Sequence, residues 1–170
     1  SIIIKRINLI ESVLSGVLFH GLYLGGVFFS ISIGMPTSIA ALIVTLQPIL
    51  TNILSGPILN EKVTLKQWIG VLLGFFGAAL VLGLDLGSKI PLLGLVATLI
   101  ALISITASTI WQKKLSNNLP LSVSNFYQAI GGCFFHILVV IFFAKPYIAF
   151  TKTFLFSMGH QIFLVSFGAF

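Results

Sequence analysis

Charged residues are scarce in this chain of 170 residues. Nine Lys or Arg and three Asp or Glu make up 7% of the sequence, whereas a typical soluble domain carries about 25%. Between Ser12 and Asn60 there is no Asp, Glu, Lys or Arg, and the mean hydropathy of the chain is +1.16. A soluble fold could not cover its surface with this composition, but a bilayer core of about 30 Å takes helices of about 20 such residues. The sequence therefore predicts a polytopic, all-α membrane protein with the lipid bilayer as a partner.

Cysteine and acidic residues are also too few to predict a disulfide, a metal site or a catalytic site. The single cysteine, Cys133, lies in an apolar run and excludes an intrachain disulfide. The acids Glu11, Glu61 and Asp85 fall at the edges of apolar runs or between them, and no cluster of His, Cys, Asp and Glu has the spacing of a metal site. No Gly-rich loop follows a strand pattern, so there is no phosphate cradle. We therefore expect no cofactor, no metal site and no catalytic set.

The basic residues do not predict a nucleic-acid-binding surface. The formal net charge is +6, but the cations occur in ones and twos between apolar runs and form no stripe. This distribution is typical of residues that flank membrane spans, and we expect no nucleic acid partner.

Turn-forming and charged residues divide the chain into six apolar segments. The chain begins at Ser1 rather than Met and ends at Phe170 inside an apolar run, so we expect a fragment that lacks both ends of its parent. The predicted spans are Val13–Ile33, Thr37–Leu59, Gln67–Leu84, Leu92–Trp111 and Leu121–Phe143, with a sixth that starts near Phe154.

The charges between these segments predict an orientation in the cell membrane. Successive loops must alternate between its two sides, and one side receives twice as many cations as the other. The positive-inside rule makes that side cytoplasmic, which places Glu61 in the cytoplasm and Asp85 outside. The cytoplasmic cations are Lys5, Arg6, Lys62, Lys66, Lys113 and Lys114, and those on the other side are Lys89, Lys145 and Lys152.

The second predicted span has one polar and one lipid-facing side. Small and polar residues recur on one helical face at steps of three and four, and Ile and Leu occupy the opposite face. Pro48 lies within this segment, where it leaves the carbonyl of Val44 without its usual partner. Such carbonyls at membrane depth are tolerated inside protein or beside a cavity, which is where transporters bind substrates; a kink needed only for packing is the alternative. The polar face holds Ala41, Thr45, Pro48, Asn52 and Ser55, with Gln47 and Thr51 beside it.

Other spans carry similar polar faces, which indicates either a central polar cavity or a hydrogen-bonded bundle, because a polar face is costly against lipid. His20 and His136 are the ionisable side chains that lie well inside the predicted spans, and each is a functional candidate. A neutral imidazole bonded to a neighbouring helix is the alternative for each. The candidate cavity residues are His20, Tyr23, Gln47, Asn52, Ser104, Gln128 and His136.

Two G-x-x-x-G pairs predict close approaches between helices. They are Gly21 with Gly25 in the first span and Gly70 with Gly74 in the third. Such pairs let helix backbones pack tightly, so we expect a compact bundle at both places.

The second and third spans carry two linked motifs. The run Pro36–Leu50, PTSIAALIVTLQPIL, leads to Asn60-Glu61-Lys62 and then to Gln67–Gly77, QWIGVLLGFFG. These motifs resemble the EamA family of the drug/metabolite transporter superfamily, whose pattern is an Ala-rich helix with a late Pro, a Glu-Lys at its cytoplasmic end, and then Q-x-x-G-x-x-L-G-x-x-G. The resemblance implies a structural or gating role for Pro48, Glu61, Gln67 and Gly70.

The resemblance implies a ten-helix fold of two inverted five-helix repeats. Residues 1–86 would be the last three helices of the first repeat, and residues 87–170 the first helices of the second. It also implies a secondary transporter that exports a small metabolite, such as an amino acid or a drug-like compound, by alternating access.

The alternatives to a transporter are a non-transport membrane assembly subunit and an intramembrane enzyme, and a homo-oligomer stays open. A polar pocket near the middle of the membrane would favour a transporter. Polar residues that pair with one another would favour an assembly subunit, and a buried Ser-His contact would favour an enzyme. The residues that we expect to border the pocket are Tyr23, Gln47, Asn52, Ser104 and Gln128.

Overall fold

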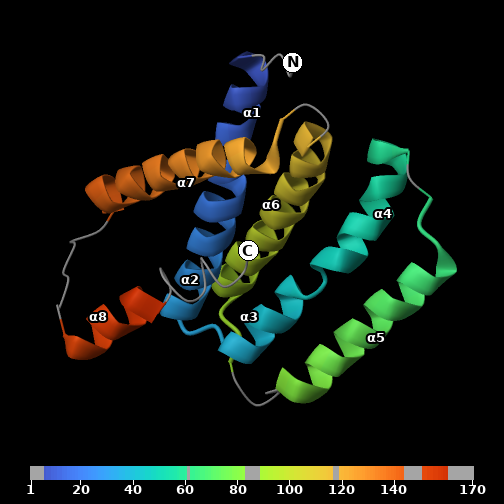
Figure 1. Ribbon diagram of the computed structural model, residues 1–170. Helices are drawn as coiled ribbons and strands as arrows, with labels where there is room; N and C mark the ends of the chain where they lie inside the picture. Colours follow the sequence, from blue (N-terminus) through green and yellow to red (C-terminus); the bar gives the residue numbers. More distant parts are fainter. Residues whose placement is uncertain (1–5, 61, 83–88, 117–118, 144–150, 161–170) are drawn as a thin grey trace. The chain divides into compact units, whose positions relative to one another are not determined.

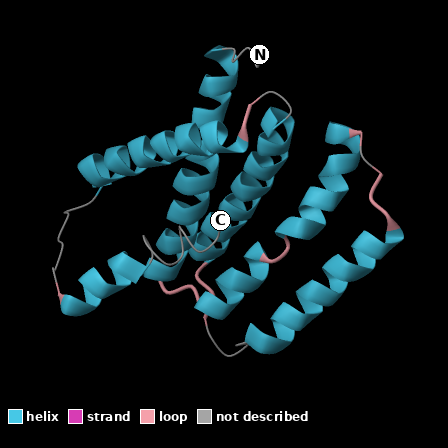
Figure 2. Ribbon diagram, viewed as in Figure 1, coloured by secondary structure: helices cyan, strands magenta, loops and turns pink. Residues whose placement is uncertain are grey.

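The computed structural model describes residues 6–60, 62–82, 89–116, 119–143 and 151–160. All regular structure in these residues is helical (Figures 1 and 2), which confirms the predicted all-α class. The elements are α1 (Arg6–Gly16), η1 (Val17–Tyr23), α2 (Leu24–Ser32), α3 (Thr37–Val44), α4 (Gln47–Leu59), α5 (Leu65–Leu82), α6 (Leu92–Ser116), α7 (Leu121–Phe143) and α8 (Lys152–Gly159).

Several of these helices can cross a membrane. Within the described residues, four continuous stretches are long and apolar enough, and a shorter apolar helix covers Leu65–Leu80. The chain is therefore a multi-pass membrane protein, as its composition predicts. The four stretches are Ile7–Ser32, Thr37–Leu59, Leu92–Ser116 and Leu121–Phe142.

The chain forms two compact units, residues 1–138 and 139–170. The first unit contains α1 to α6 and most of α7. In the second unit, the Thr151 hydroxyl caps α8 by accepting a hydrogen bond from the backbone N–H of Phe154 at 3.1 Å. The predicted sixth span corresponds to α8, and the part of that span beyond His160 lies outside the described residues.

The first span begins earlier than the sequence predicts. The helix starts at Arg6, and Glu11 lies inside it rather than on its flank. The prediction of a start at Val13 was wrong because it used Glu11 as a boundary. The polar residues Asn8, Ser12 and Ser15 are buried at helical spacing, so they belong to a packed face and not to a loop. The span also contains a π-helical turn, η1, around His20.

The second span is interrupted rather than kinked. Helix α3 ends at Val44, and α4 begins at Gln47. Between them the backbone N–H of Leu46 bonds the Ile43 carbonyl at 3.1 Å, and the Thr45 hydroxyl donates to the Leu42 carbonyl at 2.7 Å. Pro48 therefore lies in the first turn of α4, where its missing N–H removes no helical bond. The sequence indicated the disturbance but not the two-residue turn at Thr45 and Leu46 that separates α3 from α4.

Helix α6 is the best-buried element of the first unit. It packs against α1, η1, α2, α3 and α4 (Figure 1). Small residues make this possible: Ala101, Thr98 and Ser108 are fully buried. The Ser15 and Ser108 hydroxyls lie 2.9 Å apart, and Ser108 also donates to the Ser15 carbonyl at 2.9 Å. The polar face predicted for this span thus packs in part against other helices.

Helices α1 and α7 cross at very close range, and glycine residues lie at the crossing point. A Cβ atom added to Gly16 would overlap the backbone of Gln128, whose carbonyl carbon would lie 2.5 Å away. A Cβ on Gly131 would similarly overlap the carbonyl of Val13. The Ser12 and Ser124 hydroxyls, 3.3 Å apart, join the same two helices. This crossing fixes α7 against the first span.

The turn between α4 and α5 uses two local devices. Asn60 ends α4 in the left-handed conformation, with φ of 55°, which Asn tolerates better than most residues. Thr64 and Gln67 then form a capping box at the start of α5. The Gln67 side-chain oxygen accepts from the Thr64 backbone N–H at 2.7 Å, and the Thr64 hydroxyl accepts from the Gln67 N–H at 3.4 Å.

Candidate substrate cavities

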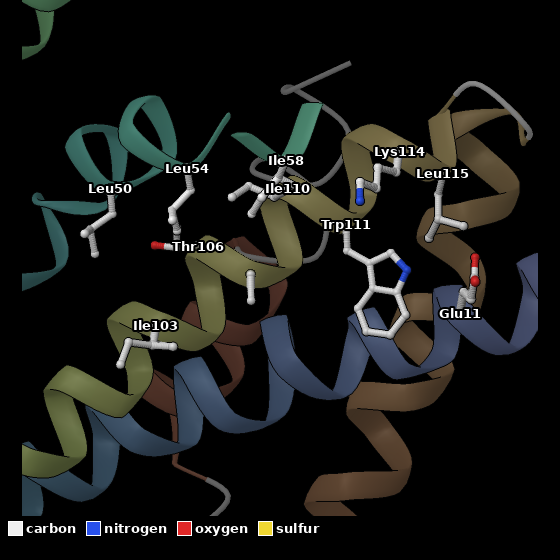
Figure 3. A pocket seen from close by; sticks show the side chains of 11 residues that line it. Glu11, Leu50, Leu54, Ile58, Ile103, Thr106, Ile110, Trp111, Lys114 and Leu115 are labelled. Carbon is white, nitrogen blue, oxygen red and sulfur yellow. The ribbon is translucent and has the colours of Figure 1, made fainter. Parts of the chain in front are cut away.

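A cavity of about 530 Å³ lies among α1, α4 and α6 (Figure 3). Most of its wall is aliphatic, from Leu50, Leu54 and Ile58 of α4 on one side and Ile103 and Ile110 of α6 on the other. Its remaining lining residues are Glu11, Thr106, Ala107, Trp111, Lys114 and Leu115.

One end of this cavity is charged. Glu11 of α1 and Lys114 of α6 lie there, together with the indole ring of Trp111 (Figure 3). The structure records no ion pair between Glu11 and Lys114 among the residues that it describes. The Thr106 hydroxyl donates to the Leu102 carbonyl at 2.7 Å, so it is already satisfied within α6. The arrangement offers a carboxylate, an ammonium and an apolar wall to one amphipathic molecule.

Sequence reasoning missed Glu11, Trp111 and Lys114 as cavity residues. Glu11 was assigned to a flank, and the fourth span was expected to end at Trp111, although α6 continues to Ser116. A signal for Glu11 was present in the sequence. Asn8, Ser12 and Ser15 continue the polar face of the first span toward the N-terminus, and Glu11 lies beside them.

A second cavity of about 500 Å³ lies at the break between α3 and α4 and faces the glycine side of α5. Gln47, Pro48 and Gly70, three residues singled out from the sequence, line it. The Gln47 amide donates to the Thr109 hydroxyl at 3.0 Å and so joins α4 to α6. A Cβ on Gly70 or Gly74 would meet no other heavy atom within 4 Å. The expectation of tight packing at this G-x-x-x-G pair is therefore wrong within the described chain, because the glycines border a cavity.

A third, smaller cavity of about 120 Å³ lies between the ends of α4 and α6 and the start of α5. Its lining is more polar than that of the other two cavities, and Asn52 and Gln67 from the predicted set line it. The Asn52 amide nitrogen and the Thr51 hydroxyl are buried there without a hydrogen-bond partner in the described structure. Its lining residues are Thr51, Asn52, Ser55, Leu59, Lys62, Val63, Gln67, Thr109, Ile110 and Lys113.

The two histidines meet at one glycine of α7. The His136 ring nitrogen Nδ1 lies 2.9 Å from the Gly132 carbonyl, one turn earlier in the same helix. The side chain of His20 packs against Gly132, where a Cβ would lie 3.1 Å from His20 Cγ. The structure thus brings together two candidates that are far apart in the sequence.

The other predicted cavity residues pack elsewhere in the first unit. Gln128 is buried and donates to the Ser124 hydroxyl at 3.0 Å. Tyr23 stacks at a tilt on Phe19, with ring centroids 6.0 Å apart, and Ser104 is buried in α6. None of these three residues lines the three cavities described above. Glu61 lies outside the described residues.

Comparison with known proteins adds a family to this multi-pass helical class. Residues 2–83 match the EamA-like transporter family. The chain is also 25% identical over 174 residues to the uncharacterized transporter YvbV of Bacillus subtilis (strain 168), an alignment that covers 96% of this chain and 55% of the relative. No solved structure matches.

The two matches together support a protein of the EamA and drug/metabolite transporter family, and the apolar helices fit a multi-pass protein of the cell membrane. The family match falls on the segment with the predicted Pro48 and Q-x-x-G motifs, so the recognised resemblance is confirmed. The chain spans about half the length of the curated relative that it matches.

Proposed function

We propose that the protein is a secondary transporter for a small amphipathic metabolite that carries both an ammonium and a carboxylate group, such as an amino acid. The cavity among α1, α4 and α6 carries this proposal. Glu11 would bind the ammonium group of the substrate, and Lys114 would bind its carboxylate. The aliphatic wall and Trp111 would contact the side chain of the substrate. Glu11 is half-buried and Lys114 is exposed, and both lie at one end of an otherwise aliphatic cavity, which favours a ligand that carries both charges.

The interrupted second span supplies a mechanism for alternating access. Helix α4 lines the charged cavity, and the break that separates α4 from α3 lines the second cavity. Because the glycine face of α5 leaves space beside the break, α4 could tilt about Thr45 and Leu46 without a clash at Gly70 or Gly74. We propose that this movement opens and closes the charged cavity, with export as the direction, and that residues 1–86 and 87–170 belong to inverted repeats.

Serine contacts between helices favour the alternative of a non-transport assembly subunit. The Ser12–Ser124 and Ser15–Ser108 contacts show that some predicted polar faces hold helices together. They do not account for Glu11 and Lys114, which no recorded bond in the described residues joins to a partner helix. For the enzyme alternative, the hydroxyls of Ser12 and Ser15 bond backbone or serine oxygens rather than either histidine.

A transport assay tests the proposal. The full-length protein is reconstituted in liposomes and screened by counterflow with amino acids, uncharged amphipathic compounds and hydrophobic cations. We expect exchange of a zwitterion, reduced tenfold or more in E11Q and in K114M, since a hydrogen bond to a charged group contributes about 1.5–3 kcal/mol.

The matched control is K66M, which removes a lysine that is exposed on α5 and lines none of the three cavities. Its transport should equal that of the wild type. Equal loss in K66M and K114M, or undiminished exchange in E11Q and K114M, would remove the basis of the proposal.

A further inference from the structure

The small polar cavity at the junction of α4, α5 and α6 has a different chemistry from the charged cavity described above. Two of its side-chain atoms, Thr51 Oγ1 and Asn52 Nδ2, are buried without a hydrogen-bond partner in the described structure. Buried polar groups are rarely left unpaired, because the loss of water is costly. The pair therefore indicates that something polar occupies the cavity in the functional protein.

The unpaired capacity of this cavity is for donating hydrogen bonds. Asn52 Nδ2 can only donate, and a lysine ammonium such as that of Lys62, which also lines the cavity, can only donate as well. Thr51 can donate through its hydroxyl. Lys62 is exposed and adds positive charge at the rim of the cavity, so the groups together suit an acceptor that carries negative charge.

The neighbouring oxygens do not supply that acceptor. The Gln67 side-chain oxygen is used by Thr64, from which it accepts two hydrogen bonds at 2.7 and 2.9 Å. The Thr109 hydroxyl donates to the Ile105 carbonyl and accepts from Gln47. The described lining contains no acidic residue.

We propose that this cavity binds an oxyanion, a phosphate or carboxylate group, through Thr51, Asn52 and Lys62. The volume of about 120 Å³ suits one such group with ordered water, since water in the liquid takes about 30 Å³ per molecule. The group is either a free anion or the headgroup phosphate of an anionic lipid, since the cavity lies where α4 and α6 end and α5 begins. The site is separate from the Glu11–Lys114 cavity and does not depend on the proposed transport function.

Thermal unfolding of the full-length protein tests the site. In detergent, the effect of inorganic phosphate is compared with that of chloride at the same ionic strength, so that the screening of protein charges is equal. In a second arm the protein is placed in vesicles of phosphatidylglycerol or of phosphatidylcholine. We expect phosphate, phosphatidylglycerol or both to raise the unfolding temperature in a saturable way, as a ligand of the native state must.

Three variants assign the effect to these side chains. N52L and K62M should weaken the apparent affinity for the anion tenfold or more, and K66M, which removes an exposed lysine outside the cavity, should leave it unchanged. N52L should not lower the unfolding temperature without the anion, because it removes an unpaired donor rather than a bond.

A response to phosphate alone identifies a free anion, and a response to phosphatidylglycerol alone identifies a lipid headgroup. The proposal is overturned if neither stabilises the wild type, or if N52L and K62M respond as the wild type does.

Discussion

Replacing Gly16 by Ala should separate α1 from α7. Carbon atoms pack at about 3.5–4.0 Å, and the new Cβ would lie 2.5 Å from the carbonyl carbon of Gln128. The helices must therefore move apart by about 1 Å. The obstacle is backbone, which cannot rotate away as a side chain could. Overpacking typically costs 1–3 kcal/mol, and we expect about 3 kcal/mol here, measured as a lowered free energy of unfolding for the full-length protein in detergent.

A glycine of α5 provides the matched control for this prediction. A Cβ on Gly77 meets no heavy atom within 4 Å, so only helix propensity changes there. Alanine in a helix interior is favoured over glycine by about 1 kcal/mol, and G77A should be neutral or stabilising. If G16A unfolded like the wild type, or if G77A lost as much stability as G16A, the close crossing of α1 and α7 would be refuted.

Further substitutions probe the turn between α4 and α5 and the histidine pair. T64V removes the hydroxyl half of the capping box, which is the bonds of the Thr64 hydroxyl to the Gln67 side chain and N–H, and should lower the free energy of unfolding by about 1 kcal/mol; an unchanged value would contradict the cap. N60A should lower the free energy of unfolding by about 1 kcal/mol, because φ is 55° at this residue. N60G should leave it almost unchanged, because glycine adopts this conformation readily. If His20 or His136 couples transport to protons, H20N or H136N should abolish the dependence of transport on a pH gradient in liposomes, and full retention would eliminate that residue.

The sequence predicted the helices well because hydrophobic runs and turn residues report directly on membrane spans. The cavities were harder to predict, because they depend on which helices pack together. Gln47, Asn52 and Pro48 do lie beside cavities, but in different ones. Gln128 and Ser104 have the same polar character and are buried between helices instead. Periodicity identifies a polar face without showing what that face meets.

Glu11 illustrates a second limit. A charged residue near the end of an apolar run reads as a boundary, and a helix that continues past it cannot be distinguished by hydropathy alone. Ser12 and Ser15, which follow it in the sequence, are buried. Their packing against α6 and α7, which draws this part of the helix into the bundle, required the structure.

The measurement that tests the central claim most directly is equilibrium binding of matched ligands to the full-length wild type, E11Q and K114M. Each ligand is compared with its N-acetyl analogue, which lacks the ammonium, and with its amide, which lacks the carboxylate. We predict that the wild type discriminates against both analogues tenfold or more, that E11Q no longer discriminates against the N-acetyl analogue, and that K114M no longer discriminates against the amide. Discrimination that is the same in all three proteins would show that Glu11 and Lys114 do not bind the substrate.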